Sequence, residues 1–287
     1  MAENSKIEWT DHTFNPWVGC QQVSEGCANC YAERFMTRKT RWRNAWGPPV
    51  LTQRLKTSDA NWKKPLTWNR KAEKSGIRYK VFCGSLCDVF EDNRDVEEWR
   101  RELVTLIDKT PHLDWLLLTK RPENIGRLWP EAWPWPENIW IGTSVENQKT
   151  ADERIPHLVK VPVKVKFVSC EPLLGKVDLQ LRGRNYGIDD EYVNWVIAGG
   201  ESGPNARPMN PDWVRYLRDQ CQEMNVPFFF KQWGEWGPNA LYPIGKKKAG
   251  RELDGRTWEE ASAPLSERSI GHPPKFEDMN LGGTKRN

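Results

Sequence analysis

Three cysteines lie close together near the N-terminus of the chain. Cys20, Cys27 and Cys30 fall within eleven residues. Thiolates grouped this tightly can face one metal centre, and a [4Fe–4S] cluster held by three of them keeps one iron open. Structural zinc is an alternative, but closed zinc sites need four ligands and His12 would have to supply the fourth. Thiols that pack or react without a metal are a further alternative, and the spacing alone does not decide between them.

An open iron suggests a specific chemistry. It can chelate the amino and carboxylate groups of S-adenosylmethionine (SAM). Electron transfer then cleaves a carbon–sulfur bond and produces a 5′-deoxyadenosyl radical, which abstracts hydrogen from a substrate.

Four further cysteines complete the seven in the chain. Without an export signal, thiols stay reduced, so disulfides are not expected. Cys221 falls in an amphipathic segment and is expected in the core. Cys87 and Cys170 lie near expected strand ends, where a thiol could donate hydrogen to a product radical. Buried packing is the default for both, and Cys87 is retained as a candidate catalytic residue.

Apolar strand patterns alternate with helical patterns along most of the chain. Such alternation predicts an α/β fold, here a partial (β/α)6-type barrel over residues 1–233. Residues 175–192 interrupt the rhythm as an expected loop or hairpin, and residues 234–287 form an expected C-terminal extension. The expected strands are 14–19, 79–86, 114–119, 139–143, 163–170, 195–198 and 227–230, and the expected helices are 31–40, 96–109, 123–129, 151–159 and 211–224.

Composition narrows the class of protein further. The net charge of +4 neither requires nor excludes a nucleic-acid partner, whereas 17 tryptophans provide flat surfaces for the core or for stacking on bases. The chain has no apolar stretch long enough to span a membrane and no signal-peptide pattern at its start. We therefore expect a soluble cytoplasmic protein, in a bacterium or a phage-infected host cell, with no membrane partner.

Several segments together resemble the radical SAM superfamily. The cysteine loop, followed by Tyr31 and Ala32, looks like a lengthened CxxxCxxC signature, with Asn29 where that superfamily usually has an aromatic residue. The chain also resembles a phage-associated three-cysteine-motif family of undefined function, related in motif style to spore photoproduct lyase. Segments that carry the resemblance are 7–10, 15–16, 81–86, 115–121, 142–146, 171–175, 199–208 and 228–234.

The resemblance implies where SAM would bind, because barrel enzymes use the carboxyl ends of their strands. Tyr31 is expected to compensate for Asn29 in contacting adenine. The expected SAM-contacting residues at the strand ends are Gly84, Ser85, Thr143, Ser144, Glu146 and Glu171. Tight turns, helix capping and structural hydrogen bonds are the alternative explanations for these residues.

A glycine-rich segment follows the apolar strand at 195–198. Gly199, Gly200 and Gly203 allow close backbone approach, so a cradle for an anion or adenosine is plausible, with Glu201 and Arg207 as polar walls. A simple strand-to-helix connection is the alternative. The Walker A and dinucleotide-binding glycine patterns are both absent.

Charged residues at other strand ends are candidates for substrate contacts. Lys120 with Arg121, and Lys231 next to Trp233, suit a phosphate and a stacked base. Asp88 could orient a substrate or accept a proton. Surface charge and turn capping are the alternatives.

These observations predict a radical SAM enzyme that acts on a nucleic-acid base or nucleotide. The resemblance implies a reaction that modifies or rearranges a hypermodified pyrimidine in phage-type DNA, with flavodoxin or ferredoxin as electron donor. One alternative is a DNA repair lyase like spore photoproduct lyase. Another is a non-catalytic nucleic-acid-binding protein stabilised by zinc.

Overall fold

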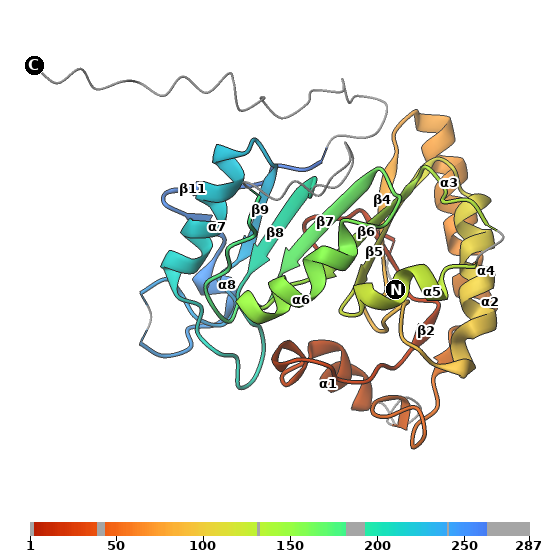
Figure 1. The fold of residues 1–287 in the computed structure, drawn as a ribbon, viewed down its shortest axis with the longest axis horizontal. Coiled ribbons are helices and arrows are strands. Elements are labelled where there is room, and N and C mark those ends of the chain that lie inside the picture. Colours follow the sequence, from red (N-terminus) through yellow and green to blue (C-terminus); the bar gives the residue numbers. More distant parts are fainter. Residues whose placement is uncertain (1–2, 39–43, 131–132, 182–192, 240, 263–287) are drawn as a thin grey trace, which may run out of the picture.

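The computed structural model describes residues 3–38, 44–130, 133–181, 193–239 and 241–262 of the 287-residue chain. Seven parallel strands form the large sheet, in the order in which they follow one another along the chain (Figure 1). Parallel strands in this order require crossovers of one hand, which place the helices on one face and curl the sheet. The result is a half-barrel made of β1 (His12–Phe14), β4 (Tyr79–Cys83), β5 (Leu113–Thr119), β6 (Ile139–Ser144), β7 (Val165–Cys170), β8 (Trp195–Gly199) and β9 (Phe228–Gln232).

Helices cover the convex face of this sheet. Their buried side chains, among them Leu103, Ile155 and Leu217, share one core cluster with outward-facing strand residues. The longer helices are α3 (Lys64–Ser75), α4 (Glu97–Asp108), α6 (Gln148–Leu158) and α7 (Pro211–Glu223). Shorter helices are α1 (Tyr31–Thr37), α2 (Asp59–Trp62), α5 (Ile125–Leu128), α8 (Lys246–Ala249), η1 (Glu25–Cys27), η3 (Arg94–Val96) and η4 (Pro122–Asn124).

Aromatic side chains fill the concave face. This second cluster contains Trp9 and strand residues such as Trp140, Phe167 and Trp195. Side chains alternate between the two faces of a strand, so polar residues follow these aromatics on the concave face near the carboxyl ends. Ser144, Ser169 and Lys231 occupy such positions. The fold therefore concentrates its polar concave positions at the carboxyl edge of the sheet.

The α/β alternation predicted from the sequence is confirmed, with three differences. Residues 14–19 were expected to form one strand, but Pro16 lacks an amide hydrogen, and the chain there divides between β1 and β2 (Trp17–Val18). Helices α2 and α3 lie between the expected helix at 31–40 and the expected strand at 79–86, where no element was predicted. The expected helix at 31–40 ends at Thr37, and its last residues lie outside the described part of the chain.

Part of the described chain beyond β9 packs against the barrel. Leu253 and Trp258 are buried in the main core, and Phe229 forms an antiparallel bridge with Glu259. Two small antiparallel ribbons complete the fold: β2 with β3 (Leu55–Lys56), and β10 (Glu252–Leu253) with β11 (Arg256–Thr257). Residues 182–192 of the expected insertion lie outside the described residues. Among the described helices, none has the length and apolar character needed to cross a membrane.

Candidate functional site

The cysteine loop lies over the carboxyl edge of the half-barrel, between β2 and α1 (Figure 1). Gly19, at the start of the loop, bridges Cys87 beyond β4, and its amide donates to the Leu86 carbonyl at 3.0 Å. Cys20, Cys27 and Cys30 are all free thiols. The loop is thus anchored at the edge where parallel barrels place their chemistry.

The three sulfur atoms have different neighbours. Cys20 Sγ accepts a contact from the Arg121 guanidinium at 3.7 Å, and Cys27 Sγ lies 3.9 Å from the Ser24 hydroxyl. Burial raises the pKa of the Cys20 thiol to about 12, and burial also raises the pKa of Cys30. Within the described ranges, no three His, Cys, Asp or Glu side chains converge closely enough to hold a metal ion.

The donor set nevertheless fits an iron–sulfur cluster in kind and number, since three free thiols of one loop can ligate three irons. Their sulfur atoms must turn toward one another to do so, and Arg121 could still donate to the Cys20 sulfur, since ligand sulfurs of clusters accept hydrogen bonds. His12 begins β1 at the amino-terminal end of the strands, whereas the cysteine loop lies over their carboxyl edge, so His12 is not placed to be a fourth zinc ligand. Its ring stacks on Trp68 with centroids 4.4 Å apart, and its Nε2 is buried without a hydrogen-bond partner among the described residues.

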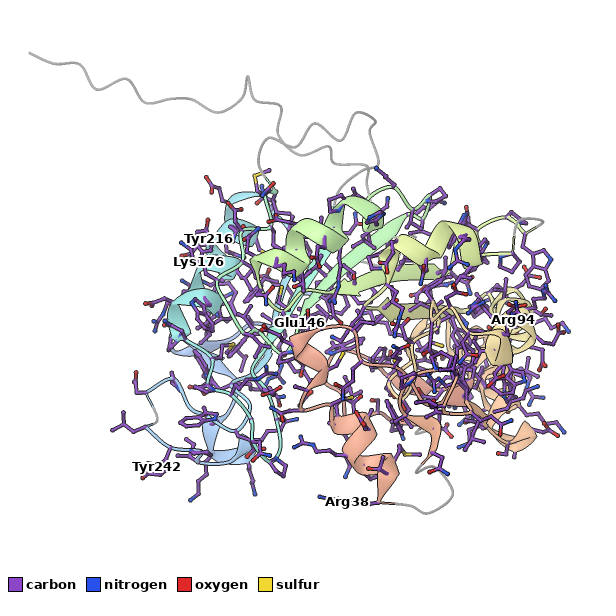
Figure 2. The ribbon with its side chains drawn as sticks, turned by 60° about the horizontal axis from the view of Figure 1, so that its bottom comes forward. Arg38, Arg94, Glu146, Lys176, Tyr216 and Tyr242 are labelled. Carbon is purple, nitrogen blue, oxygen red and sulfur yellow. The ribbon has the colours of Figure 1, made fainter. Side chains whose placement is uncertain are left out.

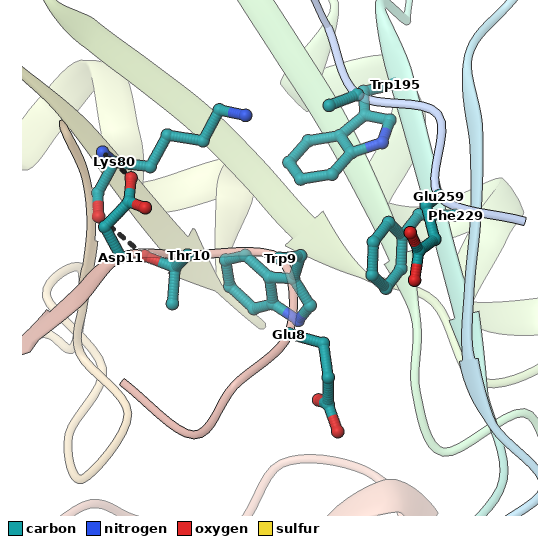
Figure 3. A pocket seen from close by; sticks show the side chains of 9 residues that line it. Glu8, Trp9, Thr10, Asp11, Lys80, Trp195, Phe229 and Glu259 are labelled. Carbon is teal, nitrogen blue, oxygen red and sulfur yellow. Dashed lines mark hydrogen bonds between the residues drawn. The ribbon is translucent and has the colours of Figure 1, made fainter. Parts of the chain in front are cut away.

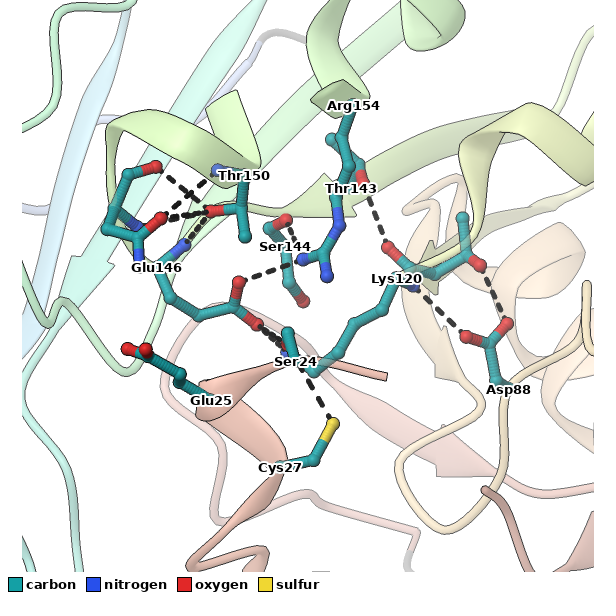
Figure 4. Close-up of polar contacts among 12 residues, drawn as sticks. Ser24, Glu25, Cys27, Asp88, Lys120, Thr143, Ser144, Glu146, Thr150 and Arg154 are labelled. Atoms are coloured by element: carbon teal, nitrogen blue, oxygen red, sulfur yellow. Dashed lines mark hydrogen bonds and ion pairs between the residues drawn. The ribbon is translucent and has the colours of Figure 1, made fainter. Parts of the chain in front are cut away.

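Glu146 connects this loop to the barrel (Figure 4). The carboxylate is fully buried and accepts from Ser24 Oγ at 2.9 Å, Lys120 Nζ at 2.6 Å and Arg154 Nη1 at 2.9 Å. Burial alone would raise the pKa of Glu146, but Lys120 and Arg154 outweigh it and lower the pKa to about 2. The sequence suggested a SAM contact for Glu146, and the structure places it as the ionised centre of a loop anchor.

Asp88 has a similar arrangement at the end of β4. Its carboxylate accepts from Arg121 Nη1 at 2.8 Å, from Thr119 Oγ1 at 2.7 Å and from the Lys120 amide at 3.0 Å. It is 5 % exposed, so its acceptor sites are occupied by protein groups. Asp88 therefore orients Arg121 beside Cys20.

Two further ion pairs continue along the same edge. Glu171 accepts from Lys231 Nζ at 2.7 Å. Glu201 binds Arg207 through both oxygens and also accepts from Asn29 Nδ2 at 3.0 Å. Asn29, which departs from the superfamily pattern, thus ties the cysteine loop to the end of β8.

The predicted cations at this edge consequently have protein partners. Lys120 pairs with Glu146, Arg121 with Asp88 and Lys231 with Glu171. A phosphate would have to compete with these carboxylates, and phosphate binding by these residues stays a prediction. Trp233 is 3 % exposed and packs on Phe230, so its faces are closed to a base.

The remaining predicted SAM contacts divide into buried and accessible groups. Thr143 is fully buried and donates to the Thr119 carbonyl at 3.0 Å. The Ser144 carbonyl accepts from Arg154 at 2.8 Å. Tyr31 is 55 % exposed and donates from its hydroxyl to the Ser85 carbonyl at 3.0 Å. Tyr31 is therefore the accessible member next to the cysteines.

The glycines of the site differ in what surrounds them. Gly84 ends β4 with φ of +94°, a conformation that favours glycine. A Cβ atom added to Gly200 would lie 2.0 Å from the Trp233 carbonyl oxygen. The absence of a side chain at Gly200 therefore makes room for the backbone of the protein itself. A Cβ atom added to Gly199 would lie 3.5 Å from the Glu171 side chain and from the Gln232 carbonyl oxygen, which is ordinary contact.

Cys87 lies below the loop. It is 8 % exposed, and burial raises its pKa well above the ordinary thiol value. Its role as a hydrogen-atom donor stays a prediction.

Some residues that organise the site were not identified from the sequence. Arg154 lies on the buried side of α6 beside Ala151 and Ile155, and a charge on an apolar helix face was the available signal. The fully buried Arg54 pairs with Glu91 at 2.6 Å and binds the Gly47 carbonyl, while the Gly47 amide donates to the Cys20 carbonyl. No sequence pattern indicates that Arg54 supports the cysteine loop through Gly47.

A pocket of about 260 Å³ lies at the opposite, amino-terminal end of the strands (Figure 3). Trp9, Lys80, Trp195 and Phe229 are among its lining residues. It is distant in the fold from the cysteine loop and belongs to a different end of the half-barrel.

The fold and site define an open α/β half-barrel with a three-cysteine loop on its carboxyl edge. The chain belongs to the family described as protein of unknown function (DUF5131), whose model matches residues 4–262. No curated protein and no solved structure gives a significant match to the chain.

Proposed function

We propose that this chain is a radical SAM enzyme that acts on a nucleic-acid base or nucleotide. The observation that carries the proposal is the location of three free cysteines, on one loop, over the carboxyl edge of a parallel half-barrel. Barrel enzymes assemble their sites at this edge, and three thiolates are the ligand number that keeps one iron open.

The residues of the chain have separate roles in this proposal. Cys20, Cys27 and Cys30 hold the cluster, while Glu146 and Asn29 hold the loop against the sheet. Bound SAM and the reduced cluster supply a 5′-deoxyadenosyl radical. Tyr31 follows the last cysteine, and Ser144, Ser169 and Glu171 lie at or just beyond strand ends; in this proposal they provide polar groups for SAM or the substrate.

The substrate in this proposal is a pyrimidine of phage-type DNA, which the enzyme modifies or rearranges. Support comes from the sequence resemblance and from the aromatic and cationic residues around the loop. A repair lyase like spore photoproduct lyase would use the same cofactors. Formation of 5′-deoxyadenosine with ultraviolet-damaged DNA, but not with modified pyrimidines, would favour the lyase.

Anaerobic reconstitution of the full chain tests the cofactor assignment. We expect a brown protein with four irons and four sulfides per chain, as the cluster formula requires. Dithionite and SAM should then give 5′-deoxyadenosine. The triple variant Cys20→Ala, Cys27→Ala, Cys30→Ala should lose both colour and cleavage, whereas Cys221→Ala, which removes a buried thiol of α7, should retain both.

Two outcomes would overturn the proposal. One is a colourless protein that carries one zinc and no iron after reconstitution, which would support the zinc-stabilised nucleic-acid-binding alternative. The other is SAM cleavage that persists in the triple variant, which would remove these cysteines from the ligand set.

A further inference from the structure

The guanidinium of Arg121 contacts the cysteine loop at two points. Its Nη1 donates to Cys20 Sγ at 3.7 Å, and its Nη2 donates to the Gln21 carbonyl at 2.7 Å. Arg121 is 7 % exposed, so these contacts lie inside the protein and not on its surface. Because arginine keeps its charge in proteins, a positive N–H group is held against the first cysteine of the loop.

Asp88 fixes the position of this guanidinium. Its carboxylate accepts from Arg121 Nη1 at 2.8 Å. It is itself held by the Thr119 hydroxyl, the Lys120 amide and the Phe90 amide, at 2.7 to 3.0 Å (Figure 4). A carboxylate with these donors cannot turn freely, so the guanidinium has little freedom to move away from Cys20.

Other cations near the loop bind elsewhere. Lys120 pairs with Glu146, and Arg34 donates to two backbone carbonyls beyond β8. Arg38, at the end of α1, lies at the margin of the molecule, away from Glu146 (Figure 2). Arg121, in contrast, contacts a cysteine sulfur directly.

Charges and hydrogen bonds at the sulfur atoms set how readily an iron–sulfur cluster accepts an electron. Reduction by one electron adds one negative charge to the cluster. A cation or an N–H donor beside a ligand sulfur stabilises the added charge, a nearby carboxylate opposes it, and burial strengthens both effects. Arg121 and Asp88 therefore act in opposite directions on a cluster that Cys20 helps to hold.

We propose that Arg121 raises the reduction potential of the [4Fe–4S] cluster through its N–H group on Cys20 Sγ, while Asp88 orients Arg121 and lowers the potential through its charge. The electron comes from the flavodoxin or ferredoxin of the proposed function, and no bond forms or breaks in this step. Arg121 acts through Cys20 and is a positioning residue. A higher potential makes the cluster easier for such a donor to reduce. The inference rests on the proposed function, which requires the cluster but not this control of its potential.

A redox titration of the reconstituted full-length protein, followed by the electron paramagnetic resonance signal of the reduced cluster, measures the potential. Arg121→Gln should lower the equilibrium constant for reduction about tenfold, as for loss of one charge-assisted hydrogen bond, which is about 59 mV for one electron. Asp88→Asn should shift the potential in the positive direction. Loss of packing alone does not produce shifts of opposite sign.

Arg78→Gln is the matched control. Arg78 directly precedes β4 at the amino-terminal end of the strands and binds Asp114 at 2.8 Å, so it is an arginine of a similar ion pair far from the loop. Its substitution should leave the potential at the parent value.

Iron content is measured in each preparation before the titration. If Arg121→Gln does not take up iron, Arg121→Lys replaces it, because one ammonium group keeps the charge but cannot reproduce the planar fork of donors. Its potential should lie below that of the parent. Two results overturn the inference: an Arg121 variant that holds the cluster at the parent potential, or Arg121→Gln and Asp88→Asn shifts in the same direction.

Failure of this inference is distinguishable from failure of the proposed function. A parent protein that binds iron and cleaves SAM with dithionite supports the proposed function, whatever the variants show. A parent protein that takes up no iron overturns both.

Discussion

The hydroxyl of Ser24 donates a 2.9 Å hydrogen bond to the fully buried carboxylate of Glu146, 122 residues later in the chain. Lys120 and Arg154 bind the same carboxylate. The loop that carries the three cysteines is therefore held by an ionised group of the barrel.

Removing the charge of Glu146 should destabilise the protein. Glu146→Gln leaves the mostly buried Arg154 without its carboxylate, and breaking a buried ion pair costs about 3 kcal/mol. Urea denaturation should show this loss in the free energy of unfolding. Glu153→Gln, on the exposed side of the same helix, is the control and should change the free energy by less than about 0.5 kcal/mol. Equal effects of the two substitutions would contradict the anchor.

Acid should weaken the same anchor. The folded-state pKa of Glu146 is lowered to about 2 from its ordinary 4.5, so its stabilising contribution is complete above the unfolded-state pKa. The contribution is lost as pH falls from about 4.5 toward 2. We expect the difference in unfolding free energy between the parent and Glu146→Gln to stay constant near neutral pH and to shrink below about pH 4.5. A difference in unfolding free energy that grows in acid would contradict the lowered pKa of Glu146.

The close approach of the loop to Glu146 gives a steric test. A Cβ atom added to Gly26 would lie 2.5 Å from Glu146 Cγ and Oε1, so Gly26→Ala must displace the loop or the Glu146 side chain that holds it. We expect a lower melting temperature and incomplete iron incorporation. Gly126→Ala is the matched control, because an added Cβ atom in α5 meets nothing within 4 Å. Full iron incorporation in Gly26→Ala would argue against a loop that is held in this position.

The cysteines should separate into two classes in the metal-free protein. Cys83, Cys170 and Cys221 are fully buried and Cys87 is 8 % exposed, and burial raises the pKa of each of these thiols. They should resist alkylation by iodoacetamide until the protein unfolds. Cys20 and Cys30 are partly exposed but also have raised pKa values, so they should react slowly near neutral pH and faster as pH increases.

Peptide mass spectrometry can assign the labelled positions. Rapid labelling of Cys83 or Cys221 in the folded protein would contradict the burial of these two thiols. In the reconstituted protein, protection of the partly exposed Cys20 and Cys30 would support their role as ligands, whereas Cys27 is already buried without a metal.

Local patterns were sufficient for most of the secondary structure. The helix expected at 211–224 is confirmed as α7, and the Asn210 side chain caps it by accepting from the Asp212 amide at 2.9 Å. The helix α3 was missed, although Pro65 in its first turn and Gly76 at its left-handed C-cap mark both ends. Its polar composition concealed the narrow apolar side that carries Trp68 and Ala72.

The sequence by itself determined the alternation of strands and helices, the half-barrel class and the grouping of three cysteines, because these depend on neighbouring residues. Which charges meet was decided only by the tertiary structure. Glu146 meets Ser24, and Glu201 meets Asn29, because parallel strands bring their carboxyl ends to one edge and the loop crosses that edge. Partners so distant in the chain leave no periodic pattern in the sequence, so the ion pairs that hold the cysteine loop could be seen only in the folded chain.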